Sequence, residues 1–166
     1  MKVTKYNMLL DDDMKAILVK ENSTYCTEVD SASSPIEIIR ILNTVFNAEH
    51  LPEEHMWMLA MNAKNKLIGI FEVAHGQGIG CSFTPREFFM RACAIGANVI
   101  TIAHNHPSGD CSPSAVDDSA TRRIVAAGRM IGIPVVDHII VGRQSWYSYA
   151  AENEEIIKTK SCKNIA

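Results

Sequence analysis

Several features that would assign this chain to a class are missing from its sequence. No apolar run approaches the roughly 18 residues that a membrane-spanning helix needs. Residues 8–10 are apolar but run directly into three aspartates, so the N-terminus lacks a signal-peptide core. The five cysteines are an odd number and form no Cys-x-x-Cys pair, which argues against a disulfide framework. We therefore expect a soluble cytoplasmic protein with reduced thiols and no membrane contact.

An excess of basic residues is absent too. The 166-residue chain has a formal net charge of −3, whereas nucleic-acid-binding domains are usually basic, so we expect no strong nucleic-acid surface. The glycine-rich residues 76–80 lack the lysine of a phosphate-binding loop and the fingerprint of a dinucleotide-binding one. We interpret them as a loop at the edge of a site. The remaining composition, 47% hydrophobic and 21% charged, is typical of a globular domain.

Turn and cap residues divide the chain into elements. Residues 1–33 are expected to form an N-terminal extension, with short strands at 16–19 and 25–29 and a turn at 21–23. Ser-Pro at 34–35 and Thr-Pro at 84–85 each predict a helix start, because a hydroxyl caps the helix and proline suits its first position. Further along, we expect strands at 56–61, 67–73, 98–103 and 135–141, a short partner strand at 145–149, helices ending near 46 and 95, a helix at 114–131, and a C-terminal tail at 151–166.

One stretch of the chain carries unusual chemistry. His104 and His106 lie two residues apart at the end of an expected strand, where a period of two points both side chains to one face. Ser114 and Asp117 open the next helix, one turn apart. Three such protein ligands would leave one position of a zinc ion open for water. The pattern therefore predicts a metal site formed by His104, His106 and Asp117.

Simpler interpretations exist for each of these side chains. Ser114-x-x-Asp117 also resembles a helix cap, a role compatible with metal binding. Asp110 and Asp118 compete for the role of ligand. We assign Asp110 to the turn after Gly109, and Asp118 faces about 100° away from its neighbour.

Other candidate side chains lie around the motif. His138 would either support the site through a hydrogen bond or be a core histidine. The thiol of Cys111 could bind metal, oxidise or be inert, and we expect it to be inert. The three remaining histidines lack a partner pattern and are expected to be structural or exposed: His50, His55 and His75.

The spacing His-x-His, seven residues, Ser-x-x-Asp resembles the metal signature of the JAB/MPN (JAMM) family. Residues 104–110 are closer still to the RadC-like branch, as are Thr84-Pro85-Arg86-Glu87, Thr121 and the segment 137–142. The resemblance covers residues 34–150 and implies one RadC-like domain there. It implies an α/β fold of the cytidine-deaminase-like kind, an α-β-α sandwich around a curved mixed β-sheet. It also implies Zn²⁺ as the cofactor.

The family resemblance also implies a catalytic carboxylate. By alternation alone, Glu72 would be a strand residue that points to solvent. The RadC-like pattern Leu-Ile-x-x-x-Glu-x-x-x-Gly instead makes it the general base, with Glu53, Glu54 and Glu87 as rivals, of which Glu87 already serves a helix cap. Ser114 would hydrogen-bond the oxyanion.

These residues together predict a function. The expected activity is that of a zinc-dependent metallohydrolase that cleaves a peptide or isopeptide bond in a peptide or protein substrate. The alternative is a non-catalytic metal-binding accessory protein linked to DNA repair or recombination.

Overall fold

A seven-stranded mixed sheet organises the computed structural model, which describes residues 1–76 and 84–158. The strand order is β2-β1-β4-β3-β5-β6-β7. The strands are β1 (Lys2–Leu10), β2 (Ala16–Tyr25), β3 (Glu54–Met61), β4 (Leu67–Gly76), β5 (Val99–Asn105), β6 (Val135–Val141) and β7 (Trp146–Ser148). The helices are α1 (Pro35–Phe46), the short 3₁₀ turn η1 (Ala48–His50), α2 (Pro85–Ile95), α3 (Ala115–Ile131), α4 (Tyr149–Glu152) and α5 (Glu154–Ile157).

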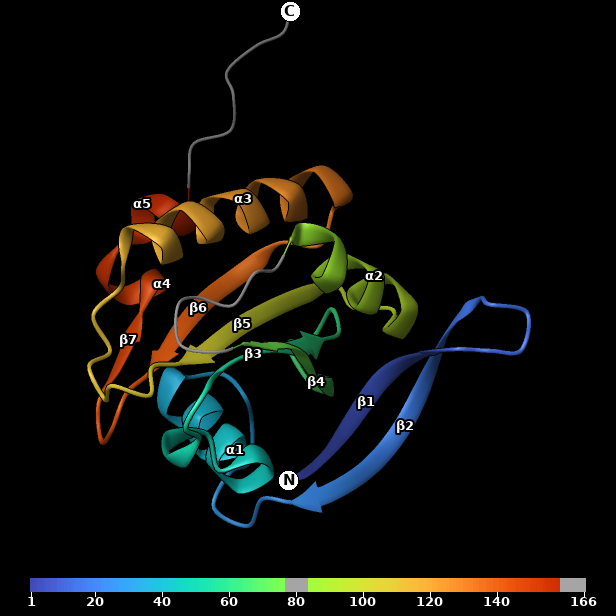
Figure 1. Cartoon of the computed structure of the whole chain (residues 1–166), viewed down its shortest axis with the longest axis horizontal. Helices are drawn as coiled ribbons and strands as arrows, with labels where there is room; N and C mark the ends of the chain where they lie inside the picture. Colours follow the sequence, from blue (N-terminus) through green and yellow to red (C-terminus); the bar gives the residue numbers. More distant parts are fainter. Residues whose placement is uncertain (77–83, 159–166) are drawn as a thin grey trace, which may run out of the picture.

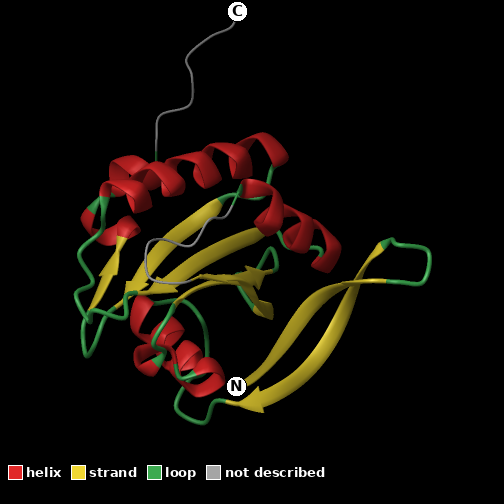
Figure 2. Ribbon diagram, viewed as in Figure 1, coloured by secondary structure: helices red, strands yellow, loops and turns green. Residues whose placement is uncertain are grey.

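Helices cover both faces of this sheet, so the predicted α-β-α arrangement is confirmed (Figures 1 and 2). On one face, the apolar stripe of α1 packs against Trp57, Leu59 and Ile70. On the other face, α2 and α3 cover a core that includes Met56, Met58 and other strand residues of opposite parity. Because side chains alternate along a strand, the residues of β3 from Met56 to Ala60 contribute in turn to one core and then the other. This alternation decides which side chains can share a site.

The N-terminal extension differs from its prediction. It forms one long antiparallel hairpin, in which β1 and β2 pair from Lys2↔Tyr25 to Leu10↔Ala16. The turn lies at residues 11–14, where the Asp11 carboxylate accepts hydrogen bonds from the amides of Asp13 and Lys15. β1 joins the sheet by pairing in parallel with β4 at Lys5↔Ile70. The hairpin extends away from the helices and strands of residues 34–150 (Figure 1, blue).

The helix boundaries follow the caps predicted from the sequence. Each of the three long helices begins with a capping box, in which a hydroxyl residue and a carboxylate three residues later satisfy each other's backbone amides. Gly96 and Gly132 end α2 and α3 with φ of 72° and 81°, the left-handed conformation that glycine adopts without strain. Residues 77–80 of the predicted glycine-rich loop lie outside the described residues. Within the described ranges, no helix has the length and apolar character needed to cross a membrane.

Candidate metal centre

The end of β5 and the first turn of α3 bring three metal-ligating side chains together. His104 Nε2 lies 3.3 Å from Asp117 Oδ1, and His106 Nε2 lies 3.6 Å from Asp117 Oδ2. The two imidazole Nε2 atoms are 2.9 Å apart. The side chain of His104 is 4% exposed and that of Asp117 16%, so the cluster is sheltered but still reachable from solvent. These are the three residues that the motif predicts as ligands.

Asp117 is held in place by the helix cap. Ser114 is the N-cap of α3, and both its backbone amide (2.8 Å) and its hydroxyl (2.6 Å) donate to Asp117 Oδ2. In return, the Asp117 amide donates to Ser114 Oγ at 3.2 Å. The capping and ligand interpretations of this pair are therefore compatible in geometry, because the same carboxylate that closes the cap also faces both histidines.

The turn after His106 orients its imidazole. His106 Nδ1 lies 2.7 Å from the Asp110 carbonyl oxygen and donates to it, which leaves Nε2 facing Asp117. The Asp110 carboxylate instead accepts from the Ser112 amide at 2.9 Å, so it stabilises the turn as predicted. Gly109 has φ of 84°, and a Cβ there would lie 3.2 Å from that of Arg143. This position therefore favours glycine.

A buried hydrogen-bonded chain fixes the other imidazole. Thr121 Oγ1 donates to the Asp117 carbonyl oxygen at 2.6 Å and lies 2.6 Å from His138 Nδ1. Since the threonine proton is already used, His138 Nδ1 is the donor to Thr121. His138 Nε2 then accepts from His104 Nδ1, 2.8 Å away. The chain thus assigns the neutral tautomer of His104 whose Nε2 lone pair faces Asp117, as a metal ligand requires.

The electrostatics of the cluster favour a bound cation. Burial raises the pKa of the Asp117 carboxyl, but its contacts with His104 and His106 outweigh burial and hold the pKa well below its usual range. The adjacent Asp117 carboxylate raises the pKa of His106, and the nearby Glu54 carboxylate adds to that rise. Burial lowers the pKa of His138 well below its usual value, so this ring is neutral at pH 7.

The donor set fits a divalent metal such as Zn²⁺. Imidazole nitrogens and a carboxylate are ordinary zinc ligands, and bonds of about 2.0–2.2 Å in a tetrahedron place ligand atoms about 3.3–3.6 Å apart. The two histidine–aspartate separations match this spacing. The two imidazoles are closer and would have to separate by roughly half an ångström on binding. Three protein ligands leave the fourth position free.

Comparison with known proteins agrees with this geometry. Residues 32–155 match the family model described as RadC-like JAB domain. This chain is a RadC-like JAB domain protein. It is similar to a UPF0758 protein of Symbiobacterium thermophilum, with 43% identity over 100 residues that cover 60% of this chain and 43% of that protein. A UPF0758 protein of Caldanaerobacter subterraneus subsp. tengcongensis is 39% identical over 112 residues, 68% of this chain and 47% of its own. The chain thus spans less than half the length of these two relatives.

In this RadC-like domain, the structure does not bring Glu72 to the His-His-Asp cluster. Across β3, Glu72 pairs with Trp57, whereas His104 pairs with the preceding residue, Met56. Neighbouring residues of a strand point to opposite faces, so Glu72 lies on the α1 side of the sheet and His104 on the α3 side. The Glu72 carboxylate contacts His55 and His75 instead, at 3.2 and 3.4 Å. This placement does not suit a general base for the cluster.

Glu54, one of the rivals for that role, does lie on the cluster's face of the RadC-like domain. It is two residues before Met56 on β3 and therefore shares a face with Met56 and His104. Its carboxylate is close enough to His106 to raise the pKa of that imidazole. The sequence signal was present: continuing the alternation of β3 two residues before the predicted start at Met56 would have found Glu54.

Asn105 holds the strand end that carries Glu54. Its side-chain amide donates to the Glu53 carbonyl oxygen at 2.9 Å, and its oxygen accepts from the His55 amide at 2.7 Å. These two bonds bracket Glu54 on either side. The residue between the two candidate ligand histidines of the RadC-like domain thus fixes the backbone that presents the Glu54 carboxylate.

The other candidate side chains have structural partners. Asp118 accepts a hydrogen bond from the Tyr149 hydroxyl at 2.8 Å, and so faces away from the ligand cluster as predicted. Cys111 is partly buried and packs against the small core of Ile140, Tyr149 and Ile156. Among the described residues, it belongs to neither group of side chains able to hold a metal.

Proposed function

We propose that this RadC-like domain is a zinc-dependent hydrolase of the JAMM type that cleaves a peptide or isopeptide bond. The observation that carries the proposal is the convergence of His104, His106 and Asp117, each with a hydrogen-bond partner that fixes its orientation. Side chains that merely stabilise a strand end would not need three separate orienting contacts.

The chemistry follows from the residues on this face of the sheet. His104, His106 and Asp117 would hold Zn²⁺, and the bound ion would supply a water with its pKa lowered towards about 7 and a Lewis acid for the scissile carbonyl. Glu54 would take a proton from the attacking water as the carbon–oxygen bond forms. It would return that proton to the leaving nitrogen as the carbon–nitrogen bond breaks. This role replaces the one predicted for Glu72.

Ser114 would have two successive partners in this scheme. Its hydroxyl donates to Asp117 Oδ2 in the resting geometry, which orients the carboxylate. To stabilise the oxyanion, the exposed hydroxyl would have to rotate from Asp117 towards the substrate. A single donor of this kind is typically worth about 10²–10³ in rate.

The first experiment is zinc analysis of wild type and His106→Ala, purified without added metal and then offered Zn²⁺. The proposal predicts that His106→Ala loses about one equivalent relative to wild type. Equal zinc content in the two proteins would overturn the assigned ligands.

The second experiment tests the base. A library of blocked peptides and isopeptide-linked peptides is incubated with the zinc-loaded protein, and new amino groups are identified by mass spectrometry. Glu54→Gln is expected to lose about 10²–10⁴-fold in turnover while keeping its zinc. Glu53→Gln is the matched control, because it makes the same change one residue away and keeps the backbone carbonyl that Asn105 binds. A loss in Glu72→Gln without one in Glu54→Gln would restore the original assignment.

The non-catalytic alternative makes a different prediction. A metal-binding accessory protein would retain zinc through His106 but show no turnover that depends on Glu54. DNA binding would additionally show a steep dependence on salt, because phosphate contacts release counterions. The net charge of −3 does not favour that result.

A further inference from the structure

A second cluster of metal-ligating side chains lies on the opposite face of the sheet. His55 of β3 and Glu72 and His75 of β4 each offer one ligand atom, and the three atoms lie within 4.8 Å of one another. His55 Nδ1 and His75 Nδ1 lie 3.2 and 3.4 Å from the same oxygen, Glu72 Oε1. These separations are close to the roughly 3.3–3.6 Å expected between the ligands of a tetrahedral zinc ion.

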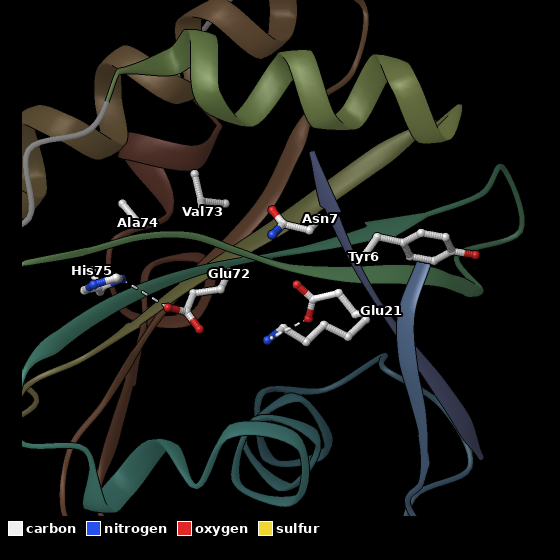
Figure 3. A pocket seen from close by; sticks show the side chains of 8 residues that line it. Tyr6, Asn7, Glu21, Glu72, Val73, Ala74 and His75 are labelled. Atoms are coloured by element: carbon white, nitrogen blue, oxygen red, sulfur yellow. Dashed lines mark ion pairs between the residues drawn. The ribbon is translucent and has the colours of Figure 1, made fainter. Parts of the chain in front are cut away.

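A β-bulge creates this cluster. His55 pairs with His75 across the strands, so these two rings share a face, and they stack with centroids 5.4 Å apart. Glu72 and His75 are three residues apart and would point to opposite faces of a regular strand. The register shift between Met56 and Trp57 leaves Val73 as an extra residue in β4, which brings Glu72 onto the face of His75. Figure 3 shows Glu72 and His75 turned towards each other, with Val73 and Ala74 pointing the other way.

The cluster opens onto a pocket of about 250 Å³ between the N-terminal hairpin and β4. Glu72 and His75 form one wall, and Lys5, Asn7 and Glu21 of the hairpin form another (Figure 3). The side chains of His55 and Glu72 are 16% and 27% exposed, whereas that of His75 is 63% exposed. Two ligands are thus held by the sheet, and the third faces solvent, which gives a metal ion a route of entry and leaves space for water or a small ligand.

From this geometry we infer that His55, Glu72 and His75 form a second binding site for a divalent transition metal, with Zn²⁺ as the best match. The two imidazole nitrogens suit Zn²⁺, which also accepts a carboxylate oxygen, whereas Mg²⁺ and Ca²⁺ prefer sites made of oxygen ligands. The site is independent of the proposed hydrolase centre, because the two clusters share no residue and face opposite sides of the sheet. One pocket wall comes from residues before position 32, outside the segment that matches the family.

The test uses zinc binding in a background where the first cluster is disabled. The 166-residue chain carrying His106→Ala is dialysed against Zn²⁺, and its zinc content is compared with that of His106→Ala/His75→Ala. The single variant is expected to retain about one equivalent and the double variant none. This result does not depend on whether the first cluster is catalytic, so failure here and failure of the proposed function are distinguishable.

Two further variants separate metal binding from simple ion pairing. His106→Ala/Glu72→Gln replaces the carboxylate with an amide of the same shape and so removes its charge. We expect its Zn²⁺ affinity to fall by more than the roughly 10- to 100-fold that loss of an outer partner costs. His106→Ala/His50→Ala is the matched control, because His50 is exposed and belongs to neither cluster, and it should bind like the parent.

The inference would be overturned if His106→Ala held no zinc, or held it unchanged in the His75→Ala background. Cobalt provides the second measurement. Co²⁺ added to His106→Ala should give the visible absorption of a bound, low-coordinate ion, and His75→Ala should remove it. An absorption that is identical in both proteins would also contradict the site.

Discussion

His104 Nδ1 lies 2.8 Å from His138 Nε2, although the two histidines are 34 positions apart in the sequence. His138 is fully buried, stacks on Tyr149 with centroids 5.0 Å apart, and donates a hydrogen bond from Nδ1 to Thr121 Oγ1. Its two predicted roles are therefore both real: it is a core residue, and it supports a candidate ligand.

His138→Phe should weaken zinc binding at the first cluster without unfolding the domain. Phenylalanine keeps the stacking on Tyr149 but cannot accept the His104 proton, so the ligand loses its fixed tautomer. We expect a loss of about 10- to 100-fold in affinity. Competition with a chromogenic chelator, in the His75→Ala background, would measure it. Thr121→Val should also lower the affinity for zinc. Unchanged affinity in both variants would show that the hydrogen bonds through His138 and Thr121 do not support metal binding.

Asn105→Ala should lower turnover while leaving zinc in place. The substitution removes the two hydrogen bonds that hold the backbone on either side of Glu54. The His55 amide and the Glu53 carbonyl then lose their side-chain partner. Loss of such buried partners costs about 1–3 kcal/mol in the free energy of unfolding. Urea unfolding would measure this cost, and zinc analysis with peptide turnover would separate the two effects. Zinc loss equal to that of His106→Ala would instead assign Asn105 to the ligand shell.

Zinc should stabilise the protein through the first cluster. In the His75→Ala background, Zn²⁺ at about 100 times its Kd should add roughly 2.7 kcal/mol, or about 5–10 °C in Tm for a chain of this size. Thermal unfolding with and without a chelator would measure the shift. Asp117→Asn in the same background should abolish it, since the cluster loses its only carboxylate.

Glu37 should make the stability of the fold depend on pH. Hydrogen bonds from Ser31 and Ser33, and the cap at Ser34, lower the pKa of Glu37 from 4.5 to about 2. Because the folded pKa is the lower one, this contribution is present above about pH 4.5 and is lost as the pH falls towards 2. Glu37→Gln keeps the cap but should reduce the difference in the free energy of unfolding between about pH 5 and about pH 3, measured by urea unfolding. Glu155→Gln, an exposed substitution in α5, should leave the pH dependence of the free energy of unfolding unchanged.

Local signals in the sequence were enough to predict most of the elements. Ser34-Pro35, Thr84-Pro85 and Ser114 begin the three long helices, because capping depends on residues within one turn. The hairpin at residues 1–25 was not predicted. Its turn residues, Asp11 to Asp13, form a charged run rather than an Asn-Gly type of turn, whereas the polar residues 21–23, which predicted a turn, lie within β2.

Local signals likewise predicted only part of the candidate sites. His104, His106 and Asp117 lie within 14 consecutive residues, so their spacing alone predicted the cluster that the structure contains. The face of Glu72 depends on how β4 pairs with β3 and on the bulge at Val73, and no local pattern encodes that pairing. The contact between His104 and His138 likewise arises only when β5 and β6 lie side by side.

The alternation at the start of β3 has a consequence for how this chain tolerates change. Glu54 faces one metal cluster, and the next residue, His55, belongs to the other. Deleting or inserting a single residue within this stretch would exchange the two side chains between faces and damage both centres in one event. Point substitutions, in contrast, can alter either centre alone. We therefore expect length variation among functional descendants of this chain to fall in the loops around β3 and to spare residues 54–57.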